Sequence, residues 1–182
     1  MNDALPPRFF DAVEIAGIPF SQHLLRIRIH QQQMFLYIKG SEEHASAYRV
    51  KRNFLISTSR FGIGQQEGSN RTPLGLHCVK EMIGGTWPAG TVFKGREPVG
   101  FTWAGMPDAK ITTRILWLDG LQPGLNRGGN VDSHARYIYI HGTADQRSLG
   151  RPGSCGCIHM ADRDLVPLFH QLPPGTLVWI EE

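Results

Sequence analysis

The sequence predicts a mostly β domain, sandwich-like or barrel-like, with one late helix. Three observations lead to this fold class. The chain of 182 residues contains 21 glycines and 12 prolines, a composition that suits short strands joined by turns. Its apolar residues recur mainly in short alternating runs, the period of a half-buried strand. Only one segment, near the C-terminus, has the apolar spacing of a helix.

The first part of the chain predicts a hairpin and two further strands. An alternating apolar and basic run is followed, after three glutamines, by a second apolar run that stops at a glycine, and this pair is typical of a hairpin. Two more short runs follow. The strands expected in this part are residues 25–29, 34–38, 47–50 and 54–58.

The middle of the chain alternates polar loops with longer strands. Residues 60–73 and 119–133 are glycine-bearing polar stretches that predict loops. The Gly- and Pro-rich stretch 84–100 predicts an insertion over the surface, suited to a lid or a wall of a substrate site. Strands are expected at residues 74–83, 111–118 and 136–140.

The helix is expected after Cys157. Asp162 or Asp164 is a suitable cap, and Pro167 is expected in the first turn, where proline is tolerated. The chain then ends in a strand at residues 177–180, after a Pro-Pro-Gly stop. The apolar side of this helix is expected to consist of Leu165, Leu168 and Phe169.

Charge and hydropathy exclude several classes of function. The 19 Lys and Arg residues against 16 Asp and Glu give a scattered net charge of +3, so no nucleic-acid partner is expected. No apolar run approaches the roughly 20 residues that span a bilayer, so no membrane insertion is expected. The start of the chain lacks the basic and apolar regions of a signal peptide. We therefore expect a cytoplasmic protein, or a periplasmic one if a leader has been removed.

The domain is expected to cover residues 24–182, after an N-terminal lead-in of residues 1–23. Three prolines, at positions 6, 7 and 19, are expected to interrupt regular structure in that lead-in. The three cysteines are an odd number, which fits a reducing compartment and is a poor disulfide framework. Of these, Cys78 lies in a strand-like run and is expected in the core.

The residues that indicate chemistry are His141 and Cys157. His141 ends a β-branched and aromatic run and is followed by Gly142. Cys157 lies sixteen residues later, among small residues that let a substrate approach the backbone closely. A thiol becomes a nucleophile when a neighbouring histidine takes its proton. The pair therefore predicts a cysteine nucleophile with a histidine base, provided that the fold brings them together.

These residues resemble the signature of the L,D-transpeptidase catalytic domain, the YkuD-like family. The family's usual form is H-G-[ST], about a dozen residues, and then S-H-G-C-[IV]-R-[ML]. This chain has His-Gly-Thr at 141–143 and Ser-Cys-Gly-Cys-Ile-His-Met at 154–160. Residues 72–75, Thr-Pro-Leu-Gly, resemble the family's T-P-x-G element, and residues 175–180 resemble its closing G-T-x-V-x-I strand.

The resemblance implies a role for each matching residue. Cys157 is the implied nucleophile and His141 the general base and later acid, with the Gly142 carbonyl orienting the histidine ring. Backbone N–H groups of Gly156 and Cys157 form the implied oxyanion hole. The implied substrate is a peptidoglycan tetrapeptide, attacked at the bond between the L-centre of diaminopimelate and the terminal D-alanine. No cofactor and no metal are expected.

Two positions depart from the family pattern. Cys155 stands where a histidine is usual, and His159 stands where an arginine is usual. Histidine is only partly charged at pH 7, so this change removes a permanent carboxylate binder. We expect Ser154, Cys155, His159 and Arg71 to contact substrate. Further residues that suit the rim of a carboxylate-binding cleft are Arg60, Asn70, Asn126, Arg127 and Asn130.

The acceptor of the acyl group decides the reaction. Water gives an L,D-carboxypeptidase, whereas an amine gives cross-linking or exchange of D-amino acids. Because cross-linking takes place outside the cytoplasmic membrane, the expected cytosolic location favours a carboxypeptidase that trims tetrapeptides in murein recycling. L,D-transpeptidation is the alternative.

Two other classes of function stay open at this stage. One is a zinc site, because His141, Cys155, Cys157 and His159 are four possible zinc ligands, although C-x-C-x-H departs from the usual spacing of zinc ligands. The second is a non-catalytic murein-binding β domain, in which the cysteine and the histidine have no catalytic role.

Overall fold

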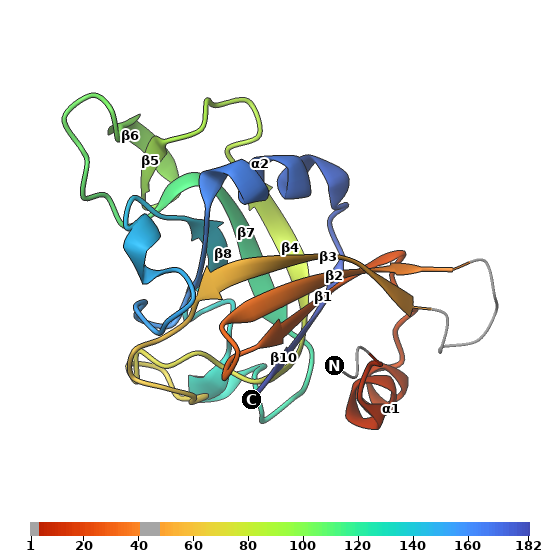
Figure 1. Ribbon diagram of the computed structural model, residues 1–182. Helices are drawn as coiled ribbons and strands as arrows, with labels where there is room; N and C mark the ends of the chain where they lie inside the picture. Colours follow the sequence, from red (N-terminus) through yellow and green to blue (C-terminus); the bar gives the residue numbers. More distant parts are fainter. Residues whose placement is uncertain (1–3, 41–47) are drawn as a thin grey trace.

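The computed structural model describes residues 4–40 and 48–182. These residues form one mixed sheet of ten strands and two α-helices (Figure 1). The mostly β class is therefore confirmed. The strands are β1 (His23–Arg28), β2 (Gln33–Lys39), β3 (Tyr48–Ser57), β4 (Gly75–Ile83), β5 (Thr91–Lys94), β6 (Glu97–Phe101), β7 (Thr112–Gly120), β8 (Tyr139–Gly142), β9 (Ile158–Met160) and β10 (Leu177–Glu181).

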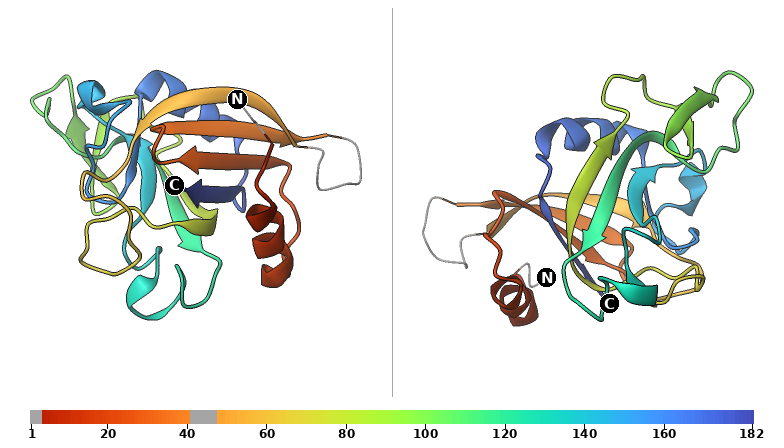
Figure 2. Two further views of the ribbon diagram at one scale, coloured as in Figure 1. Left: turned by 60° about the horizontal axis from the view of Figure 1, so that its bottom comes forward. Right: turned by 180° about the vertical axis from the view of Figure 1, so that it is seen from behind.

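The sheet closes on itself into a barrel. Its strand order is β4-β10-β1-β2-β3-β9-β8-β7, and β7 pairs again with β4, so these strands form a ring (Figure 2). Most neighbours are antiparallel. Two pairs are parallel, β1 with β10 and β8 with β9. The β5–β6 hairpin branches off β7 and projects from one end of the barrel (Figure 1).

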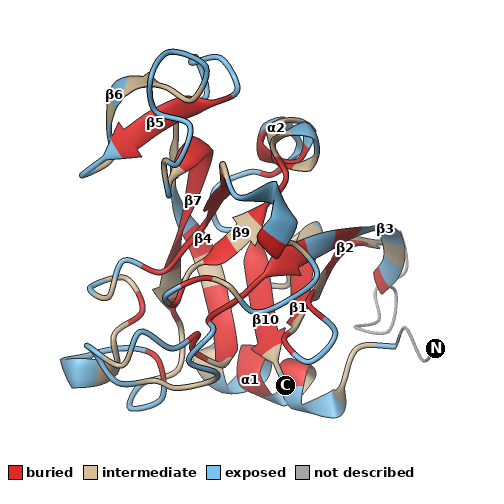
Figure 3. Ribbon diagram, turned by 60° about the vertical axis from the view of Figure 1, so that its left-hand side comes forward, coloured by how far each residue is buried: buried red, intermediate tan, exposed pale blue. Residues whose placement is uncertain are grey.

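Closure gives several strands two buried faces. In β1, Leu25 and Ile27 belong to the main core inside the barrel, whereas Leu24 belongs to a second cluster on the outer face. Strands buried on both faces lose strict alternation, and β1 and β2 each have four consecutive buried residues. Figure 3 shows this buried band running through β4, β10 and β1.

The second cluster is covered by α1 (Pro7–Ala16), a helix that was not expected from the sequence. Phe9, Ala12 and Val13 bury one side of this helix against β1, β2, β4 and β10. The prediction that prolines interrupt this segment is wrong, because Pro7 occupies the first helical position. Its fixed φ suits that position and its missing N–H would have had no partner there. The helix ends at Gly17, which has a left-handed φ of 63°.

The expected late helix is present as α2 (Asp162–Gln171), and it lies across β7 and β8 (Figure 1). Its predicted apolar side is buried. Two details differ from the expectation. The cap is Ala161, with no side-chain hydrogen bond, and Pro167 lies inside the helix rather than in its first turn. An interior proline removes one backbone hydrogen bond, here the bond to the Arg163 carbonyl.

Most expected strands are confirmed, with shifted ends. Residues 47–50 and 54–58 were expected to form two strands, but β3 continues through the polar residues 51–53, because these also pair with β2, with one register shift between Leu36 and Tyr37. Ala47 lies outside the described residues. β8 begins at Tyr139 rather than at 136, because Tyr137 has a left-handed φ of 57°. Short 3-10 segments occur at Gly129–Val131 and Gln146–Ser148.

The stretch 84–100, expected as an insertion over the surface, contains β5 and most of β6. Val92 and Phe93 are buried on β5, so this stretch has a core face of its own. The turn of the hairpin is Gly95-Arg96, and both residues have left-handed φ values, 56° and 72°. Two such residues form the tight turn whose twist matches paired strands. The hairpin is therefore a structured arm beside the barrel end where β7 and β8 meet.

Candidate active site

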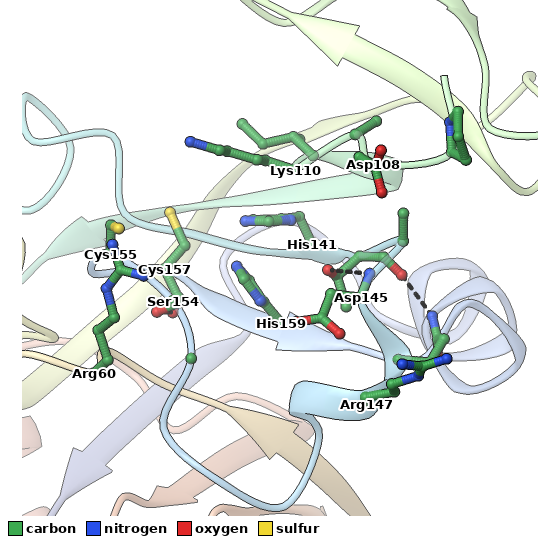
Figure 4. Close-up of a pocket in the computed structure, with 17 residues that line it drawn as sticks. Arg60, Asp108, Lys110, His141, Asp145, Arg147, Ser154, Cys155, Cys157 and His159 are labelled. Atoms are coloured by element: carbon green, nitrogen blue, oxygen red, sulfur yellow. Dashed lines mark hydrogen bonds between the residues drawn. The ribbon is translucent and has the colours of Figure 1, made fainter. Parts of the chain in front are cut away.

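The parallel pairing of β8 and β9 brings His141 and Cys157 together. His141 pairs with His159, and Ile140 with Ile158, so Cys157 lies one step before β9 and beside Tyr139. Alternate residues of a strand share a face, which places Tyr139, His141, Cys157 and His159 on one side of the sheet. His141 and Cys157 line the same cavity (Figure 4). The sixteen-residue separation in sequence is thus bridged by adjacent strands.

His141 is held in one orientation. Its side chain is buried, and Nδ1 lies 2.7 Å from the carbonyl oxygen of Gly142. A carbonyl only accepts, so Nδ1 carries the proton and Nε2 keeps its lone pair. Burial, and to a smaller extent the neighbouring His159, lower the pKa of His141 to about 3, although the hydrogen bond to the Gly142 carbonyl acts to raise it. The ring is therefore neutral near pH 7 and can accept a proton.

Cys157 is a protonated thiol at rest. It is half-buried, and Sγ donates a weak hydrogen bond of 3.4 Å to the carbonyl oxygen of Tyr137. Burial raises the pKa of Cys157 to about 11, although the backbone of Tyr139 and the guanidinium of Arg136 lower it. A neutral thiol and a neutral imidazole thus share the cavity, and proton transfer between them has to accompany nucleophilic attack.

The loop before Cys157 is fixed by Ser154. Its hydroxyl donates to the carbonyl of Cys157 at 2.5 Å and accepts the N–H of Gly156 at 3.2 Å. Gly156 has a φ of 121°, a conformation that side chains rarely adopt. Ser154 was predicted to contact substrate, and its hydroxyl is occupied within the loop. Among the described residues the N–H of Cys157 has no partner, so the predicted oxyanion hole has one donor already engaged and one available.

Thr72 anchors the same loop, a role that the sequence did not indicate. Thr72 is fully buried, and its hydroxyl donates to the carbonyl of Gly156 at 3.0 Å. It also accepts the N–H of Ser59 at 3.0 Å. The T-P-x-G element, weak as a sequence motif, therefore has a physical task in holding the nucleophile loop.

The other predicted site residues divide into two groups. Cys155 is exposed and His159 half-buried, and both line the cavity. The rings of His159 and His141 are 4.8 Å apart, and burial lowers the pKa of His159 to about 4 while Asp145 acts to raise it. Arg71 does not line the cavity. It is exposed, its side chain lies beside Gly64, and its carbonyl accepts a hydrogen bond from Arg136 at 2.7 Å.

The cavity has a volume of about 830 Å³ and extends beyond the predicted residues. One wall is the segment 107–111, which follows the β5–β6 hairpin, so the expected wall lies just beyond the stretch 84–100. Of the suggested rim residues only Arg60 contributes. Asn126 is buried and bonds to Gln122, Leu74 and Leu76. The charged residues that line the cavity are Arg60, Asp108, Lys110, Asp145 and Arg147.

Two further findings bear on alternative functions. Within the ranges 4–40 and 48–182, no three His, Cys, Asp or Glu side chains gather in a way that would hold a metal ion. The described helices include none that is both long enough and apolar enough to cross a membrane.

Solved structures share this fold at low sequence identity. Bd1075 from Bdellovibrio bacteriovorus has a TM-score of 0.57 and 15% identity, over 98% of this chain and 54% of that one. L,D-transpeptidase 3 from Mycobacterium tuberculosis has a TM-score of 0.52 and 14% identity, over 88% of this chain and 61% of that one. An Enterococcus faecium L,D-transpeptidase has a TM-score of 0.52 and 14% identity, over 89% and 50%. The chain thus spans about half to three fifths of the length of these proteins.

The comparison with curated proteins gave no match. The sequence model of the YkuD family, described as the L,D-transpeptidase catalytic domain, matches residues 22–180. This match covers nearly the whole chain and includes His141, Cys157 and the loop between them. The chain therefore belongs to the YkuD family of L,D-transpeptidase catalytic domains.

Proposed function

We propose that the protein is an L,D-carboxypeptidase, a cysteine acyl-transfer enzyme that removes the terminal D-alanine from peptidoglycan tetrapeptides. The observation that carries this proposal is the placement of His141 on β8 and of Cys157 directly before the parallel strand β9, where both line one cavity. The oriented imidazole supports it, because its Nε2 is kept as a proton acceptor. The family acts on peptidoglycan stem peptides, which supports the choice of substrate.

The reaction divides into acylation and hydrolysis. In acylation the Cys157 thiol passes its proton to Nε2 of His141 while sulfur attacks the carbonyl carbon of the L-centre. The tetrahedral intermediate collapses, the C–N bond breaks, and His141 returns the proton to the departing amine of D-alanine. A thioester remains on Cys157. Water then attacks this thioester as His141 takes its proton, the C–S bond breaks, and the thiol is restored.

The charge of the cavity favours water as the acceptor. Three cationic side chains, Arg60, Lys110 and Arg147, line it against two carboxylates, Asp108 and Asp145. An acceptor amine is an ammonium ion at neutral pH and is repelled by a net positive cavity, whereas water is not. Transpeptidation, with an amine of a second stem or a free D-amino acid as acceptor, is the alternative that the family itself supports.

We place this activity in the cytosol, where tetrapeptides released from murein are recycled. Cys78, Cys155 and Cys157 are all free thiols, and Cys155 is exposed beside the nucleophile. An exposed thiol at this position suits a reducing compartment, because oxidation next to the nucleophile would compete with catalysis.

Mass spectrometry of a disaccharide tetrapeptide or a nucleotide-linked tetrapeptide tests the proposal. The enzyme is incubated with each substrate, with and without added D-methionine. Loss of one D-alanine, with little incorporation of D-methionine, is the expected result. Incorporation of D-methionine or formation of dimers would establish the transpeptidase alternative instead.

Two variants test the assignment of the catalytic pair. Cys157→Ser and His141→Ala are both expected to lose nearly all activity while remaining folded by circular dichroism. Full activity in either variant would overturn the mechanism. A folded wild-type protein that changes no substrate would favour the murein-binding alternative.

A further inference from the structure

We propose that Arg60 binds a carboxylate of the substrate and thereby selects which stem peptides the enzyme accepts. The inference rests on the proposed function, because that function supplies the substrate. Arg60 lines the cavity next to Cys155 and Cys157, and Figure 4 shows its side chain lying along the nucleophile loop.

The backbone of Arg60 is fastened to the nucleophile loop. Its N–H donates to the carbonyl of Ser154 at 3.1 Å, and Ser59 forms a parallel bridge with Ser154. Ser154 in turn bonds to the carbonyl of Cys157. The side chain of Arg60 therefore starts from a point whose position relative to the nucleophile is set by two short connections. A cation with a fixed origin next to the reacting sulfur is suited to orient a substrate.

The guanidinium of Arg60 has no anionic partner among residues 4–40 and 48–182. It forms no ion pair and no side-chain hydrogen bond there, and its one aromatic contact is with the ring of Phe61, at 5.0 Å from the ring centroid. A contact with a ring takes up none of the five N–H donors of a guanidinium in a hydrogen bond to an oxygen. Asp108 and Asp145 line the same cavity but form no ion pair with it. The N–H donors of Arg60 are thus available to an anion from outside.

Arg60 is better placed for this task than the other cavity cations. Arg147 lies in the 3-10 segment Gln146–Ser148, and Figure 4 shows it well away from Cys157, beyond Asp145. Lys110 lies on the wall formed by 107–111, and an ammonium is a point charge without the planar fork that fits a carboxylate. His159 and His141 are neutral near pH 7. Arg60 has all three properties: a backbone anchored to the nucleophile loop, a permanent positive charge, and a planar guanidinium that can bind both oxygens of a carboxylate.

The ligand is a carboxylate close to the scissile bond, and a tetrapeptide offers two. One is the terminal carboxylate of D-alanine, and the other is the side-chain carboxylate of diaminopimelate. Both present the same chemistry to a guanidinium. Substrates in which one or the other carboxylate is converted to an amide distinguish the two sources.

The experiment measures kcat/KM for the unmodified tetrapeptide and for its two mono-amides. The proteins compared are wild type, Arg60→Met, Arg60→Lys and Arg71→Met, with Arg163→Met as a matched surface control. We expect Arg60→Met to lose at least tenfold in kcat/KM on the unmodified peptide, mainly through KM, and Arg60→Lys to recover part of it. With wild type, one mono-amide should have a kcat/KM about tenfold below that of the unmodified peptide. The Arg60→Met substitution should not lower kcat/KM for that mono-amide any further. That amide identifies the carboxylate that Arg60 binds.

Binding is measured in parallel by calorimetry on Cys157→Ala protein, so the test does not depend on turnover. A tetrapeptide that binds through Arg60 without being cleaved by wild type supports this inference and overturns the proposed function. Activity of Arg60→Met within twofold of wild type, with unchanged discrimination among the amides, overturns the inference alone. The same holds if Arg71→Met, rather than Arg60→Met, loses the activity. Absence of any tetrapeptide binding overturns both.

Discussion

The hydroxyl of Thr72 donates a hydrogen bond of 3.0 Å to the carbonyl oxygen of Gly156, 84 residues later in the chain. This bond joins the T-P-x-G element to the residue that precedes the nucleophile. The same oxygen of Thr72 accepts the N–H of Ser59. One buried hydroxyl therefore connects Ser59 to Gly156, in the loop that carries Cys157. The position of the nucleophile therefore depends on a side chain that does not touch the cavity.

Replacing Thr72 by valine tests this link. Thr72→Val keeps the shape but leaves the carbonyl of Gly156 and the N–H of Ser59 without a partner, at a cost of about 1–3 kcal/mol per buried group. We expect a lower melting temperature and a kcat reduced by about tenfold or more, since a small displacement of a catalytic group has a large effect. Thr72→Ser is the control and should retain activity within a few fold. Equal kcat in both variants would contradict the role of this hydrogen bond.

The pH dependence of kcat/KM follows from the resting ionisation of the pair. Burial lowers the pKa of His141 to about 3, so its base form is present above that pH and is lost as the pH falls through it. Burial raises the pKa of Cys157 to about 11, so the thiol persists below that pH. We expect kcat/KM to be nearly flat from about pH 5 to 9, with no inflection near 6.5, the usual pKa of histidine. A bell-shaped profile centred near neutrality would contradict the lowered pKa of His141 and the raised pKa of Cys157.

Buried histidines also make the fold sensitive to acid. His77 is fully buried between the carbonyl of Gly75 and the hydroxyl of Ser133, and burial lowers its pKa to about 4. Between pH 6.5 and 4 the unfolded chain binds a proton at this residue and the folded one does not. The free energy of unfolding therefore falls as the pH falls through this window, by up to about 3 kcal/mol for His77 alone. Urea unfolding at pH 7 and pH 4.5 measures this loss.

The variant His77→Gln tests whether His77 causes this loss of stability in acid. It removes the titrating group while keeping an amide that can bond to both partners, so the difference in unfolding free energy between the two pH values should shrink. An unchanged difference would assign the acid sensitivity to other groups, of which His141 and His159 are the first candidates because both pKa values are lowered.

Helix α1 contributes to the stability of the barrel. Phe9 is fully buried and packs against the rings of Phe20, Tyr48 and Trp179. Phe9→Ala is expected to lower the free energy of unfolding by about 3–5 kcal/mol. Ile15→Ala, on the exposed side of the same helix, is the matched control and should change it by less than about 0.5 kcal/mol. Similar effects of the two changes would mean that α1 does not share the core.

The sequence predicted the sheet well because most of its strands carry a local signal. Alternating or continuous apolar runs mark β1, β2, β4 and β10 whatever they pair with. Closure of the barrel left no such signal, since it depends on pairing between β4 and β7. Helix α1 was not predicted because the sequence alone does not show whether a proline begins a helix or interrupts one.

The residues of the candidate site could likewise be predicted only where they belong to a local motif. His141 and Cys157 lie within one continuous segment and could be predicted from a local motif. The remaining wall of the cavity comes from Arg60 and from residues 107–111, which reach the nucleophile only through tertiary pairing. Arg71 and Asn126 show the reverse error, since polar residues in a glycine-rich loop were predicted at the rim. One lies outside the cavity and the other supports a turn.

The place of β10 between β4 and β1 has a consequence for how the protein is made. It is the last strand in chain order, yet it pairs with the first strand and with β4. A nascent chain that has already released β1 to β9 from the ribosome still has a gap in its ring. Pairings this distant in sequence form slowly and leave unpaired strand edges exposed meanwhile. The barrel therefore cannot close before residues 177–181 have been synthesised and are free to pair with β1 and β4.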